Sequence, residues 1–392
     1  MTTPRAHVAI VVHSLRSGSV GSVALRHARS LARNFDVTVI ARDAGDVAGP
    51  AVREIAVRHR NWAWLRRFGH LPNELAFLAA SSRALATLHA QQPVDVVWCH
   101  SHAATVRVGA AHRTHTAARV VMTTHGDIFG RPAGTYPLAL TWLYRWATPR
   151  AYRAADRVHV LSPAMGDIAV RSGSAQRNVR LIPNGIDAPE LGLPQPPSRT
   201  VASFMPEGTL RLLYVGSLWT VKGAHILLQA LATMRATGGP PARLTLAGDG
   251  PERAALMALA GSLGLSSSVE FLGAIPRAAL GARFESSDLV CVPSLSETLP
   301  FAALEGMVAG LPIAGSDTGG IAWLVKPGVT GALAAPGDAA ALARCITQVA
   351  ATQESLWRMG SQGQAKALAE FAWPAIEAQL DALVRELMDG AT

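Results

Sequence analysis

The sequence predicts an α/β protein built from two doubly wound parallel sheets in tandem, and three observations lead to this fold class. Strand-like apolar runs alternate with helix-like patterns along the chain, which is typical of parallel α/β sheets. The length of 392 residues exceeds one ordinary core, so two domains are expected. A stretch with five prolines and little periodicity, residues 188–209, separates the halves and predicts an exposed linker.

In the first half, apolar runs bounded by turn residues predict strands at residues 7–14, 36–42, 94–101, 119–126, 157–162 and 179–185. Apolar residues at helical spacing predict helices at residues 21–34, 74–90 and 141–155, the last with a break at its proline. These elements form an expected Rossmann-like N-terminal domain of residues 1–190, followed by a linker of residues 191–209.

The second half repeats the alternation, with strands predicted at residues 210–216, 242–248, 268–273, 288–294 and 311–315. Residues 210–371 are therefore expected to form a second Rossmann-like domain. An amphipathic helix of about residues 372–390 follows, and its pattern allows packing back onto the first domain or an ordinary C-terminal position. Ligands of such sheets bind outside the carboxyl ends of the strands, so we expect two domains facing across a cleft that holds the site.

The composition, with 49% hydrophobic and 16% charged residues, is that of a globular protein. No segment reaches the roughly 18 uncharged apolar residues of a membrane span. The first apolar run leads directly into a strand–turn–helix pattern, so we expect a cytoplasmic protein. The three cysteines, Cys99, Cys291 and Cys345, lie within apolar stretches, which predicts buried thiols rather than a disulfide, a metal site or a nucleophile.

The charge is unevenly distributed between the two halves. Residues 1–200 contain 24 Lys and Arg against 11 Asp and Glu, whereas residues 201–392 contain 12 against 16. A basic first half is compatible with phosphate groups, an anionic membrane surface or nucleic acid as partners. No nucleic-acid recognition motif accompanies the charge, so we do not expect a nucleic-acid partner.

A proline separates two glutamates in the segment SETLPFAALE, which follows a predicted strand. Pro300 suits the first turn of a helix, which places Glu297 in the preceding loop and Glu305 on the helix. The N–H groups of Leu299 and Phe301 and the helix dipole favour an anion there. Glu297 is alternatively a simple helix cap. If Glu305 is buried it needs a partner, for which sugar hydroxyls and an arginine are the two candidates.

Lys222 lies at a strand-to-helix turn on the carboxyl side of the second sheet, where a lysine reaches a phosphate as a point charge. A solvated lysine at a helix start is the alternative. His125 ends a predicted strand of the first sheet, next to Asp127, and is either a core histidine or a site residue. The histidines and cysteines show no metal-ligand spacing, and no G-x-S-x-G nucleophile elbow is present.

The first strand joins its helix through a loop that contains Gly18 and Gly21, which permits a close approach of backbone to a ligand. This loop does not match G-x-G-x-x-G, and only Asp36 and Asp43 stand near the position of a ribose-binding acid. The sequence therefore gives little support to a dehydrogenase.

The order and spacing of several short motifs resemble the retaining GT-B glycosyltransferases marked by Glu-x7-Glu, the family 4-like or group 1 glycosyltransferases. The resemblance covers nearly the whole chain. Its motifs are TTHGD (123–127), AADRVHVLS (154–162), LIPNGID (181–187), GSL…KG (216–223), AGDGPE (247–252), FLG (271–273), PSLSETLPFAALEGMVAGLPIAGSDTGGIAWLV (293–325) and GVTGALAAPGD (328–338).

The resemblance implies transfer of a hexose-type sugar from a nucleotide-diphosphate donor with retention of anomeric configuration. In the family's pattern, Glu305 binds the ribose hydroxyls and Glu297 lies at the donor sugar near the reacting centre. The backbone after Glu297 holds sugar and phosphate. Lys222 neutralises the diphosphate leaving group, and His125 contacts the donor sugar and the reaction centre. Neither a metal nor another cofactor is implied.

Three departures from the family's pattern concern the donor. Ser217 stands where many members have an arginine, so one diphosphate cation is missing unless another arginine replaces it. Leu299 and Pro300 replace the common Phe-Gly, which alters the sugar-facing loop. The usual Gly-Gly of the N-terminal loop is Gly18 followed by a serine. The base is expected to meet backbone atoms near Gly273 to Arg277.

The acceptor is expected to be a saccharide, a lipid-linked molecule or a small molecule, held by the basic first half. Residues 57–72 and 141–153 mix arginines with aromatic residues, which suits peripheral contact with an anionic membrane. Ordinary helix packing, with arginine stems lying along apolar surface, explains the same pattern. Two other functions remain compatible: a non-catalytic nucleotide-sugar-binding protein, and a phosphorylase or sugar-phosphate synthase of the same architecture.

Overall fold

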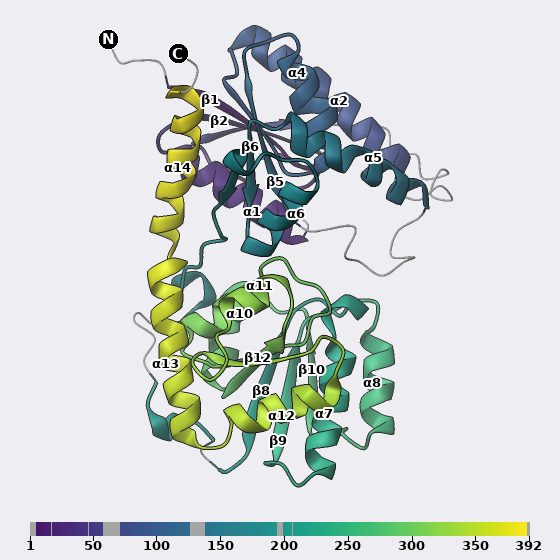
Figure 1. Cartoon of the computed structure of the whole chain (residues 1–392), viewed down its shortest axis with the longest axis vertical. Helices are drawn as coiled ribbons and strands as arrows, with labels where there is room; N and C mark the ends of the chain where they lie inside the picture. The colour runs from purple at the N-terminus through teal and green to yellow at the C-terminus, as the bar shows by residue number, and fades with distance from the viewer. Residues whose placement is uncertain are drawn as a thin grey trace. The chain divides into compact units, whose positions relative to one another are not determined.

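The computed structural model describes residues 5–16, 18–45, 47–57, 71–125, 138–193, 199–205 and 207–389 (Figure 1). The chain divides into two compact units. Unit 1 comprises residues up to Pro183 together with the segment from Ile376 onward, and unit 2 comprises Asn184–Ala375. Each unit holds one parallel sheet with helices packed on both faces (Figure 1). The predicted fold class, two doubly wound α/β units in tandem, is thereby confirmed.

The sheet of unit 1 has the strand order β3-β2-β1-β4-β5-β6-β7 and is parallel throughout. Its strands are β1 (His7–Val11), β2 (Asp36–Ala41), β3 (Val52–Ala56), β4 (Val96–Cys99), β5 (Arg119–Thr124), β6 (Arg157–Val160) and β7 (Val179–Leu181). Six of these strands start within two residues of their predicted positions. The edge strand β3 was not predicted.

The helices of unit 1 cover both faces of this sheet. They are α1 (Gly18–Leu31), α2 (Leu71–Gln91), α3 (His102–Ala104), the π-helical η2 (Thr105–Ala110), α4 (Ala111–Arg113), α5 (Leu138–Ala154), α6 (Pro163–Arg171) and the 3-10 turn η3 (Gln176–Asn178). The predicted proline break does not end α5, because Pro149 lies inside that helix.

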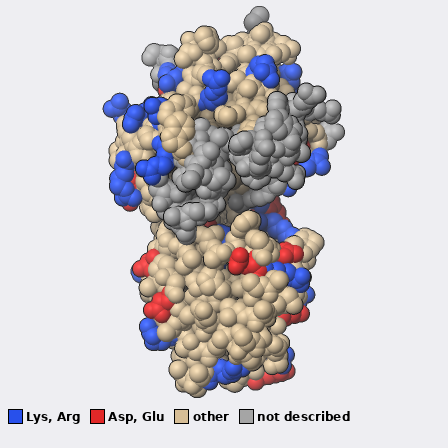
Figure 2. Space-filling view, turned by 90° about the vertical axis from the view of Figure 1, so that its right-hand side faces the viewer, with Lys and Arg blue, Asp and Glu red and all other residues tan. Residues whose placement is uncertain are grey.

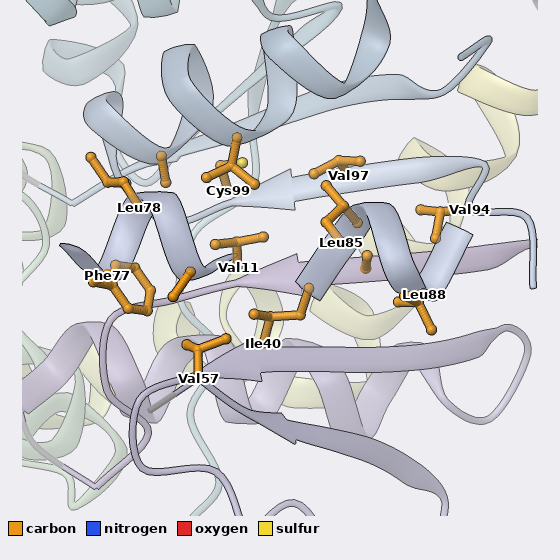
Figure 3. Packing of buried hydrophobic residues seen from close by; sticks show 14 of the residues in the cluster. Val11, Ile40, Val57, Phe77, Leu78, Leu85, Leu88, Val94, Val97 and Cys99 are labelled. Atoms are coloured by element: carbon orange, nitrogen blue, oxygen red, sulfur yellow. The ribbon is translucent and has the colours of Figure 1, made fainter. Parts of the chain in front are cut away.

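One core of unit 1 forms where α2 lies over the sheet. Apolar side chains that recur on one face of the helix pack against the strands beneath it, and Figure 3 shows them interlocking with side chains of β1, β2 and β4. The helix contributes Phe77, Leu78, Leu85 and Leu88, and the strands contribute Val11, Ile40, Val97 and Cys99.

The sheet of unit 2 has the order β10-β9-β8-β11-β12-β13 and is also parallel throughout. Its strands are β8 (Leu210–Val215), β9 (Ala242–Ala247), β10 (Val269–Gly273), β11 (Leu289–Val292), β12 (Ile313–Ser316) and β13 (Gly331–Ala334). Its helices are α7 (Ala224–Ala236), α8 (Arg253–Ser262), α9 (Leu280–Glu285), α10 (Phe301–Val308), α11 (Gly319–Leu324), α12 (Ala339–Val349) and α13 (Gln353–Glu370), with short 3-10 turns η4 (Pro189–Leu191), η5 (Val201–Ser203), η6 (Thr220–Lys222) and η7 (Arg277–Ala279).

An exposed linker was predicted for residues 191–209. The described parts of this proline-rich segment do not form one. Leu191 and Phe204 are fully buried and belong to unit 2. The boundary between the units lies at Pro183, ahead of residue 190. The linker prediction was wrong because prolines interrupt the hydrophobic periodicity of helices and strands but do not prevent single apolar side chains from packing into a core.

The C-terminal helix α14 (Trp373–Asp389) belongs to unit 1 from Ile376 onward. Its Glu386 accepts hydrogen bonds from Arg157 Nη2 at 2.8 Å and Arg180 Nε at 2.9 Å. These arginines lower the pKa of Glu386 to about 2. Ion pairs therefore connect α14 to β6 and β7 of unit 1.

The described surface agrees with the uneven charge of the sequence. On the face that Figure 2 shows, the charged residues of unit 1 are mainly Lys and Arg, whereas those of unit 2 are of both signs. No helix among the described residues is long and apolar enough to cross a membrane. Cys99 and Cys291 are buried, as predicted, whereas Cys345 is only half-buried.

Candidate active site

The strand order of unit 2 reverses between β8 and β11, which are hydrogen-bonded neighbours in the middle of the sheet. Such a switch point opens a crevice at the carboxyl ends of the strands, because the two chains leave it in opposite directions. Lys222 follows β8 in η6, and Glu297 follows β11. Their side chains form an ion pair across the switch point. Two residues 75 positions apart are thus brought together where a ligand is expected.

Glu297 has further polar neighbours. Ser294 Oγ donates to Glu297 Oε2 at 3.4 Å. Burial, with a contribution from the charge of Glu297, raises the pKa of the Tyr214 hydroxyl well above its ordinary value. That hydroxyl donates to the Ser217 carbonyl at 2.9 Å, while Ser217 itself is exposed. The turn after β8 is therefore held through its backbone, and its residue 217 contributes no charge.

Two glycines allow the loops to approach this closely. Gly223, which follows Lys222, has φ +72°, and a Cβ there would lie 2.0 Å from the Pro293 carbonyl oxygen. Gly319 has φ +49°, and its Cβ would lie 1.8 Å from the Glu297 carbonyl oxygen. A side chain at either position would force the two loops apart.

The helix α10 begins after Pro300, whose φ of −76° and ψ of +117° place it at the N-cap. The predicted location of Pro300 in the first helical turn is therefore off by one residue. Leu299 and Pro300 are buried, so their departure from Phe-Gly acts mainly on packing and on the backbone path. The first N–H groups of the helix, beginning at Phe301, have no partner within the helix, and this end is suited to an anion.

Glu305 lies in the second turn of α10, with 3% of its side chain exposed. Its Oε1 lies 2.7 Å from Arg277 Nη2. Of the two partners considered for a buried Glu305, the structure contains the arginine. Arg277 begins η7, a few residues after Gly273 at the end of β10. Gly273 has φ +72° and open space where a Cβ would stand.

His125 and Gly18 belong to unit 1. Gly18 begins α1, although it was predicted in the loop ahead of that helix, and His125 directly follows β5, whereas the predicted strand included it. The His125 ring stacks on that of His100, with centroids 5.1 Å apart, and its Nε2 lies 2.9 Å from His100 Nδ1. Burial, with smaller effects of His159 and His102, lowers the pKa of His125 to about 3, so its imidazole is neutral at physiological pH. Asp127 lies outside the described residues.

The loop between β1 and Gly18 is held by a carboxylate. Asp43 accepts hydrogen bonds from Ser14 Oγ at 2.6 Å, Leu15 N at 2.7 Å and Arg16 N at 3.1 Å. An acid committed to its own loop is poorly placed to bind the ribose of a dinucleotide. This geometry agrees with the weak support for a dehydrogenase.

Sequence reasoning expected only the backbone of Arg277 at the site, and it missed the Arg277 side chain together with His100 and Tyr214. His100 carried a usable signal, because it ends a strand as His125 does. Arg277 and Tyr214 carried none, since an arginine after a strand and a tyrosine within one are common. Among the residues that the structure describes, no group of three His, Cys, Asp or Glu is arranged to hold a metal ion.

Two family models match most of the chain: one described as glycosyl transferases group 1 over residues 201–366, and one described as glycosyltransferase family 4 over residues 20–189. The D-inositol 3-phosphate glycosyltransferase of Mycolicibacterium smegmatis is 30% identical over 81% of this chain and 74% of its own length. Sucrose-phosphate synthase of Thermosynechococcus elongatus superposes with a TM-score of 0.83 at 23% identity, covering 98% of this chain and 100% of that one. HepE of Anabaena, solved with UDP-glucose, gives 0.75 at 21% identity over 97% and 99%. The chain therefore has the GT-B fold and belongs to the group 1 glycosyltransferases.

Proposed function

We propose that this glycosyltransferase moves a hexose-type sugar from a nucleotide-diphosphate sugar to a hydroxyl group, with retention of the anomeric configuration. The observation that carries the proposal is the ion pair of Lys222 with Glu297 at the switch point of unit 2. Glu305 lies eight residues after Glu297 in the sequence, on α10. The complex of HepE with UDP-glucose and the inositol phosphate acceptor in the name of the mycobacterial relative support it.

The polar groups of unit 2 suit the three parts of such a donor. Lys222 and the N-terminus of α10 would neutralise the diphosphate, whose negative charge grows as the anomeric carbon–oxygen bond breaks. Glu297 would lie at the sugar, and Glu305 would accept from the ribose hydroxyls. The new bond forms between the anomeric carbon and the acceptor oxygen, and the acceptor proton passes to the departing diphosphate or to water.

His125 is proposed as the second catalytic group, in contact with the donor sugar. Its low pKa keeps the imidazole neutral, so that it acts through a hydrogen bond rather than a charge. Metal independence is part of the proposal, with Lys222 and the helix end in the role of a cation. Turnover that is unchanged in EDTA would support this assignment, and turnover restored only by Mg²⁺ or Mn²⁺ would contradict it.

The test is a mass-spectrometric turnover assay with pooled UDP-, GDP-, ADP- and dTDP-sugars and candidate saccharide, lipid-linked and small-molecule acceptors. Lys222→Met should lower kcat by about 10²- to 10³-fold, the usual effect of losing a group that stabilises transition-state charge. Lys326→Met, at an exposed lysine of the same unit, is the matched control. Nuclear magnetic resonance of the product then reads the anomeric configuration.

The outcomes separate the alternatives. Inversion at the anomeric carbon would contradict the retaining mechanism. Donor binding without any turnover would identify a non-catalytic nucleotide-sugar-binding protein, for which the uncharged Ser217 is the motivating feature. Transfer to inorganic phosphate or to a sugar phosphate would identify a phosphorylase or a sugar-phosphate synthase.

We further propose that unit 1 contacts an anionic membrane surface from the cytoplasmic side. On α5, Trp142 and Trp146 are 68% and 40% exposed one turn apart, and Arg150 lies 4.5 Å over the Trp146 ring. Exposed tryptophan beside arginine is typical of membrane interfaces. The other basic aromatic segment, residues 57–72, falls almost entirely outside the described residues.

Liposome sedimentation tests this contact. The protein should bind anionic vesicles more strongly than neutral ones at low salt, and Trp142→Ala should weaken binding. Trp219→Ala is the control, because Trp219 is 58% exposed but belongs to unit 2. Equal partition into neutral and anionic vesicles would contradict the proposal.

A further inference from the structure

We propose that Arg277 is a positioning residue of the donor site: it holds the Glu305 carboxylate in the orientation that accepts the ribose hydroxyls, and so sets the preference for ribose over 2′-deoxyribose. The inference rests on the proposed function, in which Glu305 binds the ribose. It adds a residue that neither the motifs nor the departures from them pointed to.

The placement of Arg277 is the first observation. Its guanidinium Nη2 lies 2.7 Å from Glu305 Oε1, and the two residues come from different elements, η7 and α10. The Arg277 side chain is 38% exposed, whereas that of Glu305 is 3% exposed. The arginine therefore reaches from the surface to a carboxylate that water barely touches.

The second observation is that the guanidinium has other neighbours that fix it. It lies 5.4 Å from the centroid of the Phe301 ring, the first residue of α10. Its Nε lies 3.8 Å from Glu190 Oε2 on η4. A planar guanidinium can meet a ring with its face and carboxylates with its edge, which an ammonium cannot do. These contacts restrict the orientation of the Arg277 guanidinium beside Glu305.

The chemistry of a buried carboxylate explains why this matters. A carboxylate removed from water without a cation or hydrogen-bond donors takes up a proton, and the protonated form donates where a ribose hydroxyl needs an acceptor. An arginine partner keeps the group ionised. Because a carboxylate offers about four acceptor positions, the ion pair of Glu305 with Arg277 is compatible with accepting from two ribose hydroxyls as well.

The same geometry argues against Arg277 as the replacement for the cation missing at Ser217. Lys222 pairs with Glu297 at the start of the loop, whereas Arg277 pairs with Glu305 in the second turn of α10. Each cation thus pairs with a different carboxylate, and Arg277 pairs with the one that is proposed to bind the ribose.

The test measures binding by calorimetry of UDP, GDP and ADP, each beside its 2′-deoxy counterpart, to the full chain. The wild type should prefer the ribonucleotide by roughly 10- to 100-fold, the worth of a hydrogen bond to a charged group. Arg277→Gln should weaken the binding of the ribonucleotide by about 10-fold and the binding of the deoxynucleotide far less. This difference would show that Arg277 and the 2′-hydroxyl are energetically coupled. Arg344→Gln, at an exposed arginine of α12, should behave as wild type.

Arg277→Lys provides a second variant if the glutamine variant does not fold. It keeps the charge but loses the planar contact, so it should restore only part of the preference. Wild-type protein that binds none of the six nucleotides would overturn the proposed function and this inference together. Wild-type protein that binds them with a ribose preference that both variants retain in full would overturn the inference alone.

Discussion

Lowering the pH from 7 to 5 should destabilise unit 1, because several of its histidines are buried as neutral imidazoles. His159 is fully buried, with its ring nitrogens 3.0 Å from Thr123 Oγ1 and 2.7 Å from the Ile182 carbonyl oxygen. His102 is 7% exposed. Burial lowers the pKa of each to about 4, and it lowers those of His27 and His100 well below the ordinary value.

The sign and the size follow from proton linkage. The unfolded chain binds a proton at each histidine below its ordinary pKa of 6.5, whereas the folded chain does so only below about 4. Stability is therefore complete above pH 6.5 and is lost as the pH falls towards 4. At pH 5 the loss is about 2 kcal/mol for His102 and for His159, or about 4 kcal/mol together. That is a large part of a typical domain stability of about 5–15 kcal/mol.

The assay is urea unfolding at pH 7, 6 and 5, with hydrogen exchange of peptides from β4 and β5 to assign the transition to unit 1. The pKa of Glu386 is lowered from 4.5 to about 2, so the stability that this carboxylate contributes is lost only below about pH 4.5. Its titration therefore does not affect the comparison of pH 7 with pH 5. His27→Leu is the diagnostic variant, since His27 Nδ1 is buried without a hydrogen bond. It should weaken the pH dependence by removing the contribution of His27, while those of His102 and His159 remain. An unfolding free energy of unit 1 that is equal at pH 7 and pH 5 would refute the reasoning.

Three further predictions concern single residues. Asp288→Ala should destabilise unit 2 by about 3–5 kcal/mol in urea unfolding, because it leaves a buried ion pair broken. Gly319→Ala should cost at least about 2 kcal/mol and abolish nucleotide binding by displacing the Glu297 loop, whereas Gly328→Ala, with open space around it, should cost only about 1 kcal/mol. Glu386→Gln should cost no more than about 1 kcal/mol, because this carboxylate is 37% exposed, and the difference should shrink in high salt.

The strands were largely predictable because the buried strands of parallel sheets read as continuous apolar runs. Most predicted strands ran too long at their carboxyl ends, as in residues 7–14 against His7–Val11. β3 was missed because Arg53 and Glu54 interrupt its apolar run at the sheet edge. β13 (Gly331–Ala334) was also not predicted, because three of its four residues are glycine or alanine, which carry little strand preference.

Individual residues of the candidate site were predictable from the sequence, whereas the contacts between them were not. Lys222 and Glu297 stood out because each follows a strand at the carboxyl edge of the sheet. Their contact depends on β8 and β11 being neighbours, and the order of strands in a sheet is not encoded in local periodicity. The contact of Arg277 with Glu305 depends likewise on where β10 and α10 lie after folding. Sequence patterns locate the edge of a sheet, whereas the partners across it are decided by topology.

Under the proposed function, the charges at this site would let a chain with Ser217 bind a diphosphate. Lys222 is one of only three lysines in the sequence, and it pairs with Glu297 at the switch point. A diphosphate brings more negative charge than one carboxylate, so Lys222 would pair more strongly with the diphosphate than with Glu297. Glu297 would then be released towards the sugar and would keep the hydroxyl of Ser294 beside it. In this proposal the same lysine couples diphosphate binding to the placement of the carboxylate, and an additional arginine at position 217 would weaken that link by sharing the phosphate charge.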